Sequence, residues 1–124
     1  MKTISLDIVN VESTENELYY NIIARITMDR LTVVMPTYTI GMFMQRDDVV
    51  GEIEEFLYII EQGMKNDTEW TTRLNDTLIM DSNTYMSDTV ANVTVYDMGG
   101  GIIQAELTQE ELDNFTDQLK QLVK

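Results

Sequence analysis

Residues 17–44 read ELYYNIIARITMDRLTVVMPTYTIGMFM, and this stretch decides the fold. Apolar side chains occupy every second position of residues 18–28, which is the period of a β-strand. Only Asp29 and Arg30 separate this run from a second alternating run that begins at Leu31. A connection this short joins antiparallel neighbours, so the stretch predicts a β-hairpin.

Pro36 limits where the second strand of this hairpin can lie. Proline has no amide donor, so we expect the strand to lie at a sheet edge or to break at Pro36. The apolar residues within 38–44 are predicted to continue the strand, with a bend at Gly41.

The same alternation predicts further strands on both sides of the hairpin. An N-terminal strand is predicted at residues 3–11, with a bulge near Ile8 where the apolar parity changes. Beyond the hairpin, further strands are predicted at residues 70–74, 77–80, 90–98 and 103–107. Three consecutive glycines before the last strand permit the positive φ angles of a hairpin turn.

A first amphipathic helix is predicted at about residues 47–63. Its apolar stripe consists of Val49, Ile53, Phe56, Leu57, Ile60 and Met64. We expect Asp47 or Asp48 to cap its first turn, because a carboxylate accepts from the free amides there. Gly63 is expected to end the helix in the left-handed conformation.

A second helix is predicted at about residues 108–123, and it has the clearest start in the chain. Thr108 and Glu111 are spaced as a capping box, in which each side chain satisfies a backbone amide of the other residue. The buried stripe is predicted to consist of Leu112, Phe115, Leu119 and Leu122.

The predicted order is a group of strands and a helix, followed by a second group of strands and a second helix. This order predicts an α+β fold. We expect an antiparallel sheet or two-sheet sandwich of about six to seven strands, with two amphipathic helices packed on it. The length of 124 residues fits a single domain spanning residues 1–124.

Composition excludes several kinds of chemistry. The chain has no cysteine and no histidine, so it has no thiolate ligand, no thiol nucleophile and no imidazole base. No apolar run approaches about 20 residues, so no membrane-spanning segment is predicted. An acid as early as Asp7 argues against a signal peptide, and we expect a cytoplasmic protein.

The remaining motifs do not predict a cofactor, a metal site or a catalytic residue. Residues 81–88 begin like a calcium loop, but the glycine and the final glutamate of that motif are missing. The glycines at 99–101 lack the lysine and the following helix of a phosphate-binding loop. Both segments are interpreted as turns, and an enzyme that uses carboxylates or a bound cation remains an alternative.

Net charge gives the main functional signal. Eight basic and 22 acidic residues leave a formal charge of −14, which disfavours direct binding to nucleic acid and favours a basic protein partner. The candidate partner-binding acids lie on the polar sides of the two helices. They are the acids Glu52, Glu55, Glu110, Asp113 and Asp117, with Tyr58 and Tyr85 as aromatic anchors. The simpler alternative is that these acids only keep the protein dispersed in water.

The layout resembles a known family. The helix segment 54–60 (EEFLYII), further strands, and the closing segment 107–112 (LTQEEL) are similar to the WapI-type immunity proteins of bacterial polymorphic toxin systems. This resemblance implies a non-catalytic protein that neutralises a toxin by binding it. The acidic balance also resembles phage proteins that mimic DNA and block defence enzymes. A monomer or homodimer is expected, and a homo-oligomeric structural protein that pairs edge strands near Pro36 or Trp70 is a further alternative.

Overall fold

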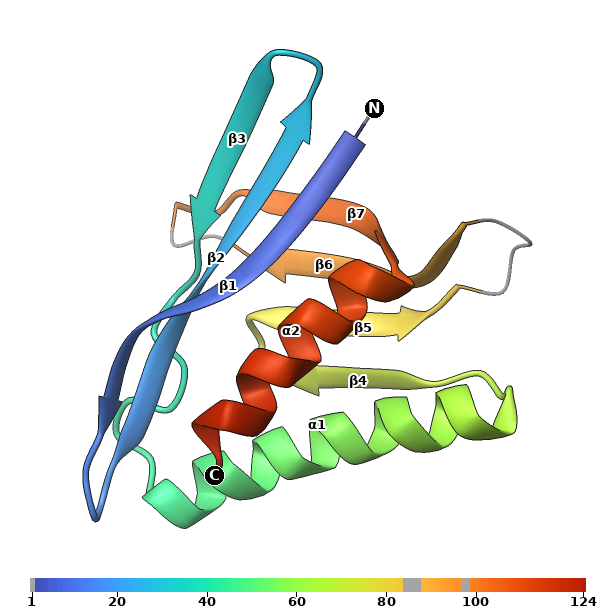
Figure 1. The fold of residues 1–124 in the computed structure, drawn as a ribbon. Coiled ribbons are helices and arrows are strands. Elements are labelled where there is room, and N and C mark those ends of the chain that lie inside the picture. The colour runs from blue at the N-terminus through green and yellow to red at the C-terminus, as the bar shows by residue number, and fades with distance from the viewer. Residues whose placement is uncertain (1, 84–87, 97–98) are drawn as a thin grey trace.

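Two antiparallel sheets and two helices build the molecule (Figure 1). A computed structural model describes residues 2–83, 88–96 and 99–124. The described elements follow the order of three strands, a helix, four strands and a helix, which confirms the predicted α+β fold. The strands form two separate open sheets. Neither helix in the described part of the chain is long and apolar enough to cross a membrane.

The predicted hairpin forms two strands of a three-stranded sheet with the order β1-β2-β3. These strands are β1 (Lys2–Ser13), β2 (Leu18–Met28) and β3 (Leu31–Pro36). The hairpin register pairs Met28 with Leu31 across the two-residue loop, as predicted. The bulge in β1 lies between Val9 and Glu12, slightly later than predicted, where Asn10 adopts a φ of 54°.

Strand β3 ends at Pro36 and does not continue as a regular strand. The chain instead stays attached to β2 through separate contacts. The Thr37 amide donates to the carbonyl oxygen of Ile22 at 2.9 Å, and Ile40 forms an isolated bridge with Tyr20. The expected strand through residues 38–44 is therefore reduced to this single bridge.

The second sheet has four antiparallel strands in sequence order. They are β4 (Thr71–Leu74), β5 (Leu78–Ser82), β6 (Thr89–Tyr96) and β7 (Ile102–Thr108). The alternation that predicted these strands reflects their packing, because every second residue faces the core: Leu74, Ala91, Val93, Val95, Ile103, Ala105 and Leu107 are all buried.

Helix α1 (Arg46–Asn66) extends three residues beyond its predicted end. Gly63 lies inside the helix, and the left-handed closing residue is Asp67, with a φ of 51°. Gly63 is needed for a different reason: a Cβ at this position would collide with the indole ring of Trp70, which packs against the helix. The glycine was therefore recognised as special, but its predicted role was wrong.

The start of α1 also differs from the prediction. The residue that precedes the helix as N-cap is Gln45, and its side chain makes no capping hydrogen bond. Asp47 and Asp48 lie in the first turn, where their negative charges interact favourably with the positive end of the helix dipole. Neither residue is the N-cap.

Helix α2 (Gln109–Leu122) begins with the predicted capping box. The hydroxyl of Thr108 accepts from the amide of Glu111 at 3.2 Å, and Oε1 of Glu111 accepts from the amide of Thr108 at 2.8 Å. Leu112, Phe115 and Leu119 are buried as predicted, whereas Leu122 is half-buried.

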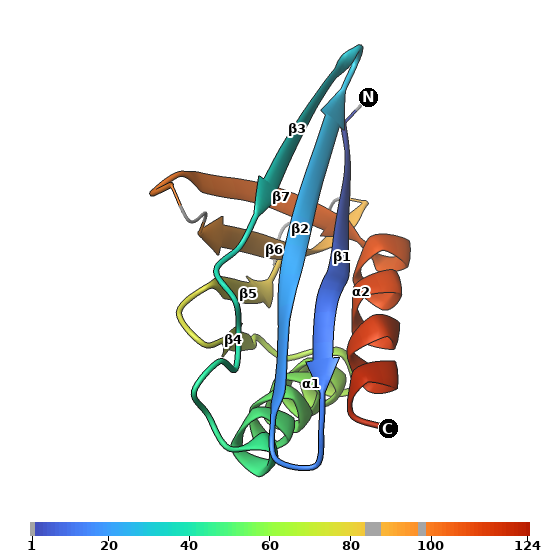
Figure 2. The same cartoon turned by 90° about the vertical axis from the view of Figure 1, so that its left-hand side faces the viewer.

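Helix α2 lies beside β1 (Figure 2), and its side chains bond to backbone groups at the outer edge of this strand. Oε2 of Glu111 accepts from the amide of Ile4 at 2.9 Å. The same carboxylate therefore hydrogen-bonds to the start of its own helix and to the sheet. Gln118 accepts from the amide of Ile8 at 2.8 Å and donates to the carbonyl oxygen of Leu6 at 3.0 Å. The helix therefore satisfies backbone groups that an edge strand would otherwise expose.

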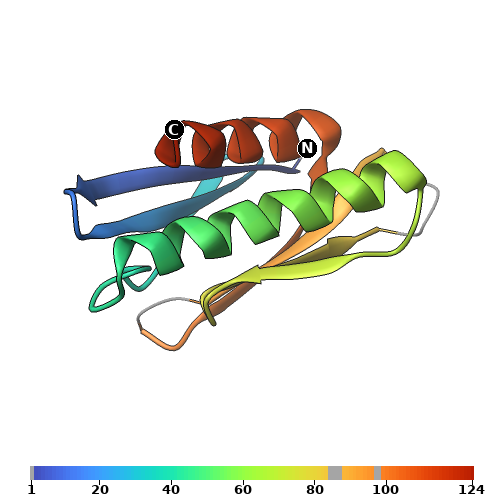
Figure 3. The same ribbon diagram turned by 90° about the horizontal axis from the view of Figure 1, so that it is seen from below.

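Both helices lie over the same side of the four-stranded sheet and run side by side in opposite directions (Figures 1 and 3). The rings of Phe56 on α1 and Phe115 on α2 meet edge to face, with centroids 6.2 Å apart and an interplanar angle of 87°. These buried rings join the helices within one hydrophobic core. The far end of the β2–β3 hairpin projects beyond this core (Figure 2).

Candidate partner-binding surface

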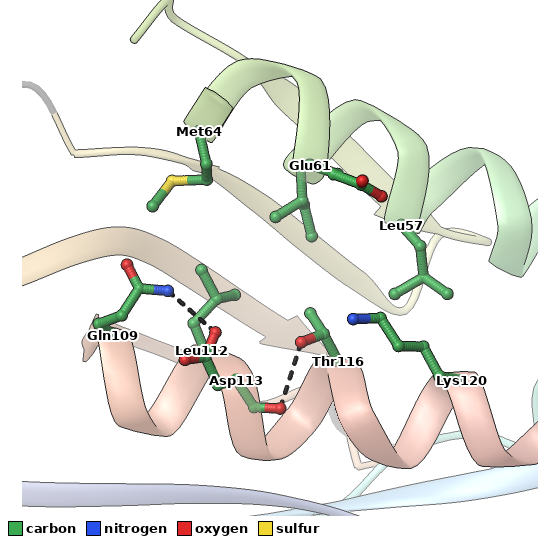
Figure 4. Close-up of a pocket in the computed structure, with 9 residues that line it drawn as sticks. Leu57, Glu61, Met64, Gln109, Leu112, Asp113, Thr116 and Lys120 are labelled. Atoms are coloured by element: carbon green, nitrogen blue, oxygen red, sulfur yellow. Dashed lines mark hydrogen bonds between the residues drawn. The ribbon is translucent and has the colours of Figure 1, made fainter. Parts of the chain in front are cut away.

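A groove of about 240 Å³ separates α1 from α2 on the outside of the molecule (Figure 4). The lining residues are Leu57, Ile60, Glu61, Met64, Gln109, Leu112, Asp113, Thr116 and Lys120.

The groove combines an apolar floor with a polar rim. Leu57 and Met64 extend from α1 toward α2, where Leu57 points toward Lys120 and Met64 lies on the side of Gln109 and Leu112 (Figure 4). Asp113 on the rim is held in place, because its carboxylate accepts from the Gln109 side-chain amide at 2.9 Å. An apolar surface with a few fixed polar groups is typical of a site that receives side chains from another molecule.

The predicted acids of α2 are all exposed, and they divide between two positions. Asp113 lines the groove, and Glu110 and Asp117 lie outside its lining. Asp117 is 3.9 Å from Lys120 across one helical turn, an exposed pair that contributes little stability. The acidic row predicted on α2 is therefore exposed at and beside the groove.

The predicted residues of α1 are only partly suited to a surface role. Glu55 is exposed, and Tyr58 is 63 % exposed on the outward side of the helix. Glu61, which was not selected from the sequence, lies closer to α2 and lines the groove. Its position one turn before the helix end and four residues after Leu57 is the sequence signal that identifies it.

Glu52 is only half-exposed, unlike the other described acids predicted from the sequence. Its carboxylate turns toward the β4–β5 turn, and its Oε1 is buried without a hydrogen-bond partner among the described residues. Burial raises the pKa of Glu52 above its ordinary value, although the Asn75 backbone and the Arg73 charge oppose this effect. The hydroxyl of Tyr20 is also buried without a partner, and burial together with the Glu52 charge raises its pKa.

Tyr85, the second predicted anchor, lies outside the described residues, as does part of the calcium-like loop at 81–88. Within the described ranges, no group of three or more acidic side chains is arranged to hold a metal ion.

One exposed aromatic residue was missed. Phe43 is fully exposed and has a φ of 66°, which is unusual for a bulky side chain. It lies with Met42 on a second surface hollow beside Glu17 and Tyr19. The run Met42–Met44 breaks the alternation of the strand, and this irregularity was the available signal.

No family model, curated protein or solved structure matches this chain. The functional argument therefore depends on the charge, shape and exposure of the residues described above.

Proposed function

We propose that this protein is a non-catalytic inhibitor that binds a basic protein through the groove between α1 and α2. The observation that carries the proposal is the apolar floor of Leu57, Met64 and Leu112 beside the exposed acids of both helices. Apolar side chains of a partner fit the floor, and its lysines and arginines meet the surrounding carboxylates.

The two parts of the surface have different physical roles. Opposite charge accelerates encounter between the proteins, and this effect weakens as salt screens the field. Buried apolar contacts in the groove slow dissociation, because a few well-packed anchors dominate interface energies. Tyr58, on the outer side of α1, extends the apolar area available to the partner.

Nucleic-acid-acting proteins are the class of partner that this charge fits best. Such proteins carry basic surfaces that bind phosphates, and a protein with a net charge of −14 competes with nucleic acid for those surfaces. The toxin-immunity role implied by the layout and the phage inhibitor role implied by the acidity both use this competition.

Affinity capture from host lysate tests the proposal. The immobilised protein is compared with the double variant Asp113→Lys/Asp117→Lys, which reverses two exposed charges of α2. We expect the native protein to retain a basic protein, with a pI above about 9, at low salt and to lose it at high salt. The double variant is expected to retain at least about tenfold less of that protein.

The matched control is Glu12→Lys/Glu15→Lys, which makes the same charge change at two exposed residues, one near the end of β1 and one in the β1–β2 connection. This control must retain the partner if the helical surface is the binding site. Equal loss in both variants would show that only total charge matters. Capture that is independent of salt would contradict the electrostatic part of the proposal.

A further inference from the structure

The two edges of the three-stranded sheet differ in how their backbone groups are covered. Glu111 and Gln118 of α2 cover backbone groups along the edge of β1. At the other edge, no strand among the described residues pairs with the outer side of β3. An uncovered edge strand is a template for pairing with another strand.

The register identifies which backbone groups of β3 face outward. Met28 and Leu31 close a two-residue hairpin loop, so they form a hydrogen-bonded pair. Alternation along the ladder then turns the N–H and C=O groups of Thr32 and Val34 away from β2. Pro36, two residues after Val34, also turns its backbone groups away from β2. Its missing amide therefore removes no hydrogen bond between β2 and β3.

Exposed apolar side chains accompany these backbone groups. Leu31 is 76 % exposed, and Val33 and Val34 on opposite faces of β3 are 52 % and 50 % exposed. Met28 at the hairpin tip is 52 % exposed. The strand projects from the core (Figures 1 and 2), and it carries exposed apolar side chains on both of its faces.

The lack of charge near β3 indicates which kind of molecule can pair with this edge. Residues 31–45 contain no charged side chain in a protein whose net charge is −14. The acids of α1 and α2 lie on elements away from the hairpin tip (Figure 1). A basic segment finds no local attraction at β3, whereas a second copy of the chain approaches here with the least repulsion.

We propose that β3 pairs antiparallel with β3 of a second copy, so that two three-stranded sheets become one continuous six-stranded sheet. A twofold axis at Val34 places this residue opposite its own copy, and it places Thr32 opposite Pro36. Each Val34 amide then donates to the Val34 carbonyl oxygen of the second copy, and each Thr32 amide donates to the Pro36 carbonyl oxygen. The symmetric pairing consumes both free edges, so the assembly closes as a dimer.

Light scattering and sedimentation across a protein concentration series test this proposal. The native chain is expected to shift from its monomer mass of 14.3 kDa to twice that mass as concentration rises. Added salt is expected to strengthen the dimer, because it screens repulsion between two acidic molecules. A native chain that remains monomeric up to about millimolar concentration contradicts the proposal.

Two substitutions at Val34 separate edge pairing from general surface hydrophobicity. Val34→Pro removes the outward amide but leaves the ladder with β2 intact, and it is expected to weaken dimerisation by about tenfold or more. Val34→Thr keeps the amide and a β-branched shape, and it is expected to retain most of the dimer. Circular dichroism confirms that both variants are folded. A folded Val34→Pro variant that dimerises like the native chain overturns the proposal.

The absence of native cysteines allows a direct test of the register. Hydrogen-bonded antiparallel partners have Cα atoms about 5.5 Å apart, within reach of a disulfide. Val34→Cys is therefore expected to crosslink to itself under mild oxidation, whereas Gln104→Cys, exposed on β7, is not. Equal crosslinking of both variants, or none at Val34→Cys, contradicts the β3 register.

The outcome is independent of the proposed inhibitor function. Binding of a basic partner weakens with salt, whereas the β3 dimer strengthens. Val34→Pro is expected to capture the basic partner normally, because Val34 does not line the helical groove. Failure of one proposal therefore leaves the other open to its own test.

Discussion

Glu52 shows how the surroundings of an acidic residue can depend on contacts that its own helix does not reveal. Helical periodicity puts it on a polar flank of α1, but the turn between β4 and β5 covers that flank. The covering turn begins more than 20 residues later in the sequence, so no local pattern reveals it. The burial of Glu52 is a tertiary effect.

The raised pKa of Glu52 predicts how stability changes with pH. The folded state binds the Glu52 proton more tightly than the unfolded state does, because burial disfavours the charged carboxylate. The contribution of this group to folding is therefore most favourable below its ordinary pKa of 4.5. It is lost as the pH rises from 4.5 through the raised folded-state pKa.

We expect Glu52→Gln to be more stable than the native protein near neutral pH and to lose this advantage at about pH 4. Glutamine keeps the shape and an acceptor oxygen but has no charge to desolvate. Urea unfolding at the two pH values measures the difference. Glu54→Gln, at an exposed position of the same helix, controls for the removal of one negative charge. A Glu52→Gln variant that is equally destabilised at both pH values would falsify this account.

At the scale of the element, the two glycines of α1 differ in the space that surrounds them. Gly63 faces Trp70 so closely that a Cβ would collide with the indole ring. Gly51 has no atom within 4 Å of the position that its Cβ would take. The same substitution therefore meets a filled space at one site and open solvent at the other.

Gly63→Ala is expected to lower the free energy of unfolding by about 1–3 kcal/mol, because overpacking exceeds the gain in helix propensity. Gly51→Ala is expected to raise it by about 0.5–1 kcal/mol, since alanine restricts the unfolded chain and favours the helix. Chemical unfolding of both variants measures this contrast. Stabilisation by alanine at both positions would show that Trp70 does not pack against Gly63 in solution.

Elements with a complete local signal were predicted well. The hairpin of β2 and β3 and the capping box of α2 depend on neighbouring residues, so sequence spacing identified both. The end of α1 was wrong because Gly63 satisfies a packing requirement set by Trp70, and spacing alone does not distinguish this role from helix termination. The apolar groove also escaped prediction, because it requires the relative placement of two helices.

At the scale of the whole molecule, the charge of −14 acts against compaction. Folding brings the carboxylates closer together, and the described ion pairs of Arg25, Arg73 and Lys120 offset few of them. Two of these pairs, at 3.6 and 3.9 Å, are exposed and contribute little. Mutual repulsion is therefore a general destabilising term.

Sodium chloride is accordingly expected to raise the thermal unfolding midpoint by a few degrees between about 10 mM and about 200 mM, where screening changes most. Differential scanning calorimetry at a fixed low protein concentration measures this shift. Glu54→Gln/Glu55→Gln, with two fewer charges on an exposed face, is expected to show a smaller shift. An unchanged midpoint in the native protein would show that the acids are too widely spaced to repel.

The contacts of Glu111 and Gln118 also impose an order of events during synthesis. They join α2 to β1 across sequence separations of 107 and 110 residues. During synthesis, β1 therefore emerges from the ribosome long before α2, the helix that covers its edge, has been made. During that interval the growing polypeptide exposes the edge of β1 as well as that of β3, so the newly made chain is most vulnerable to aggregation before α2 emerges.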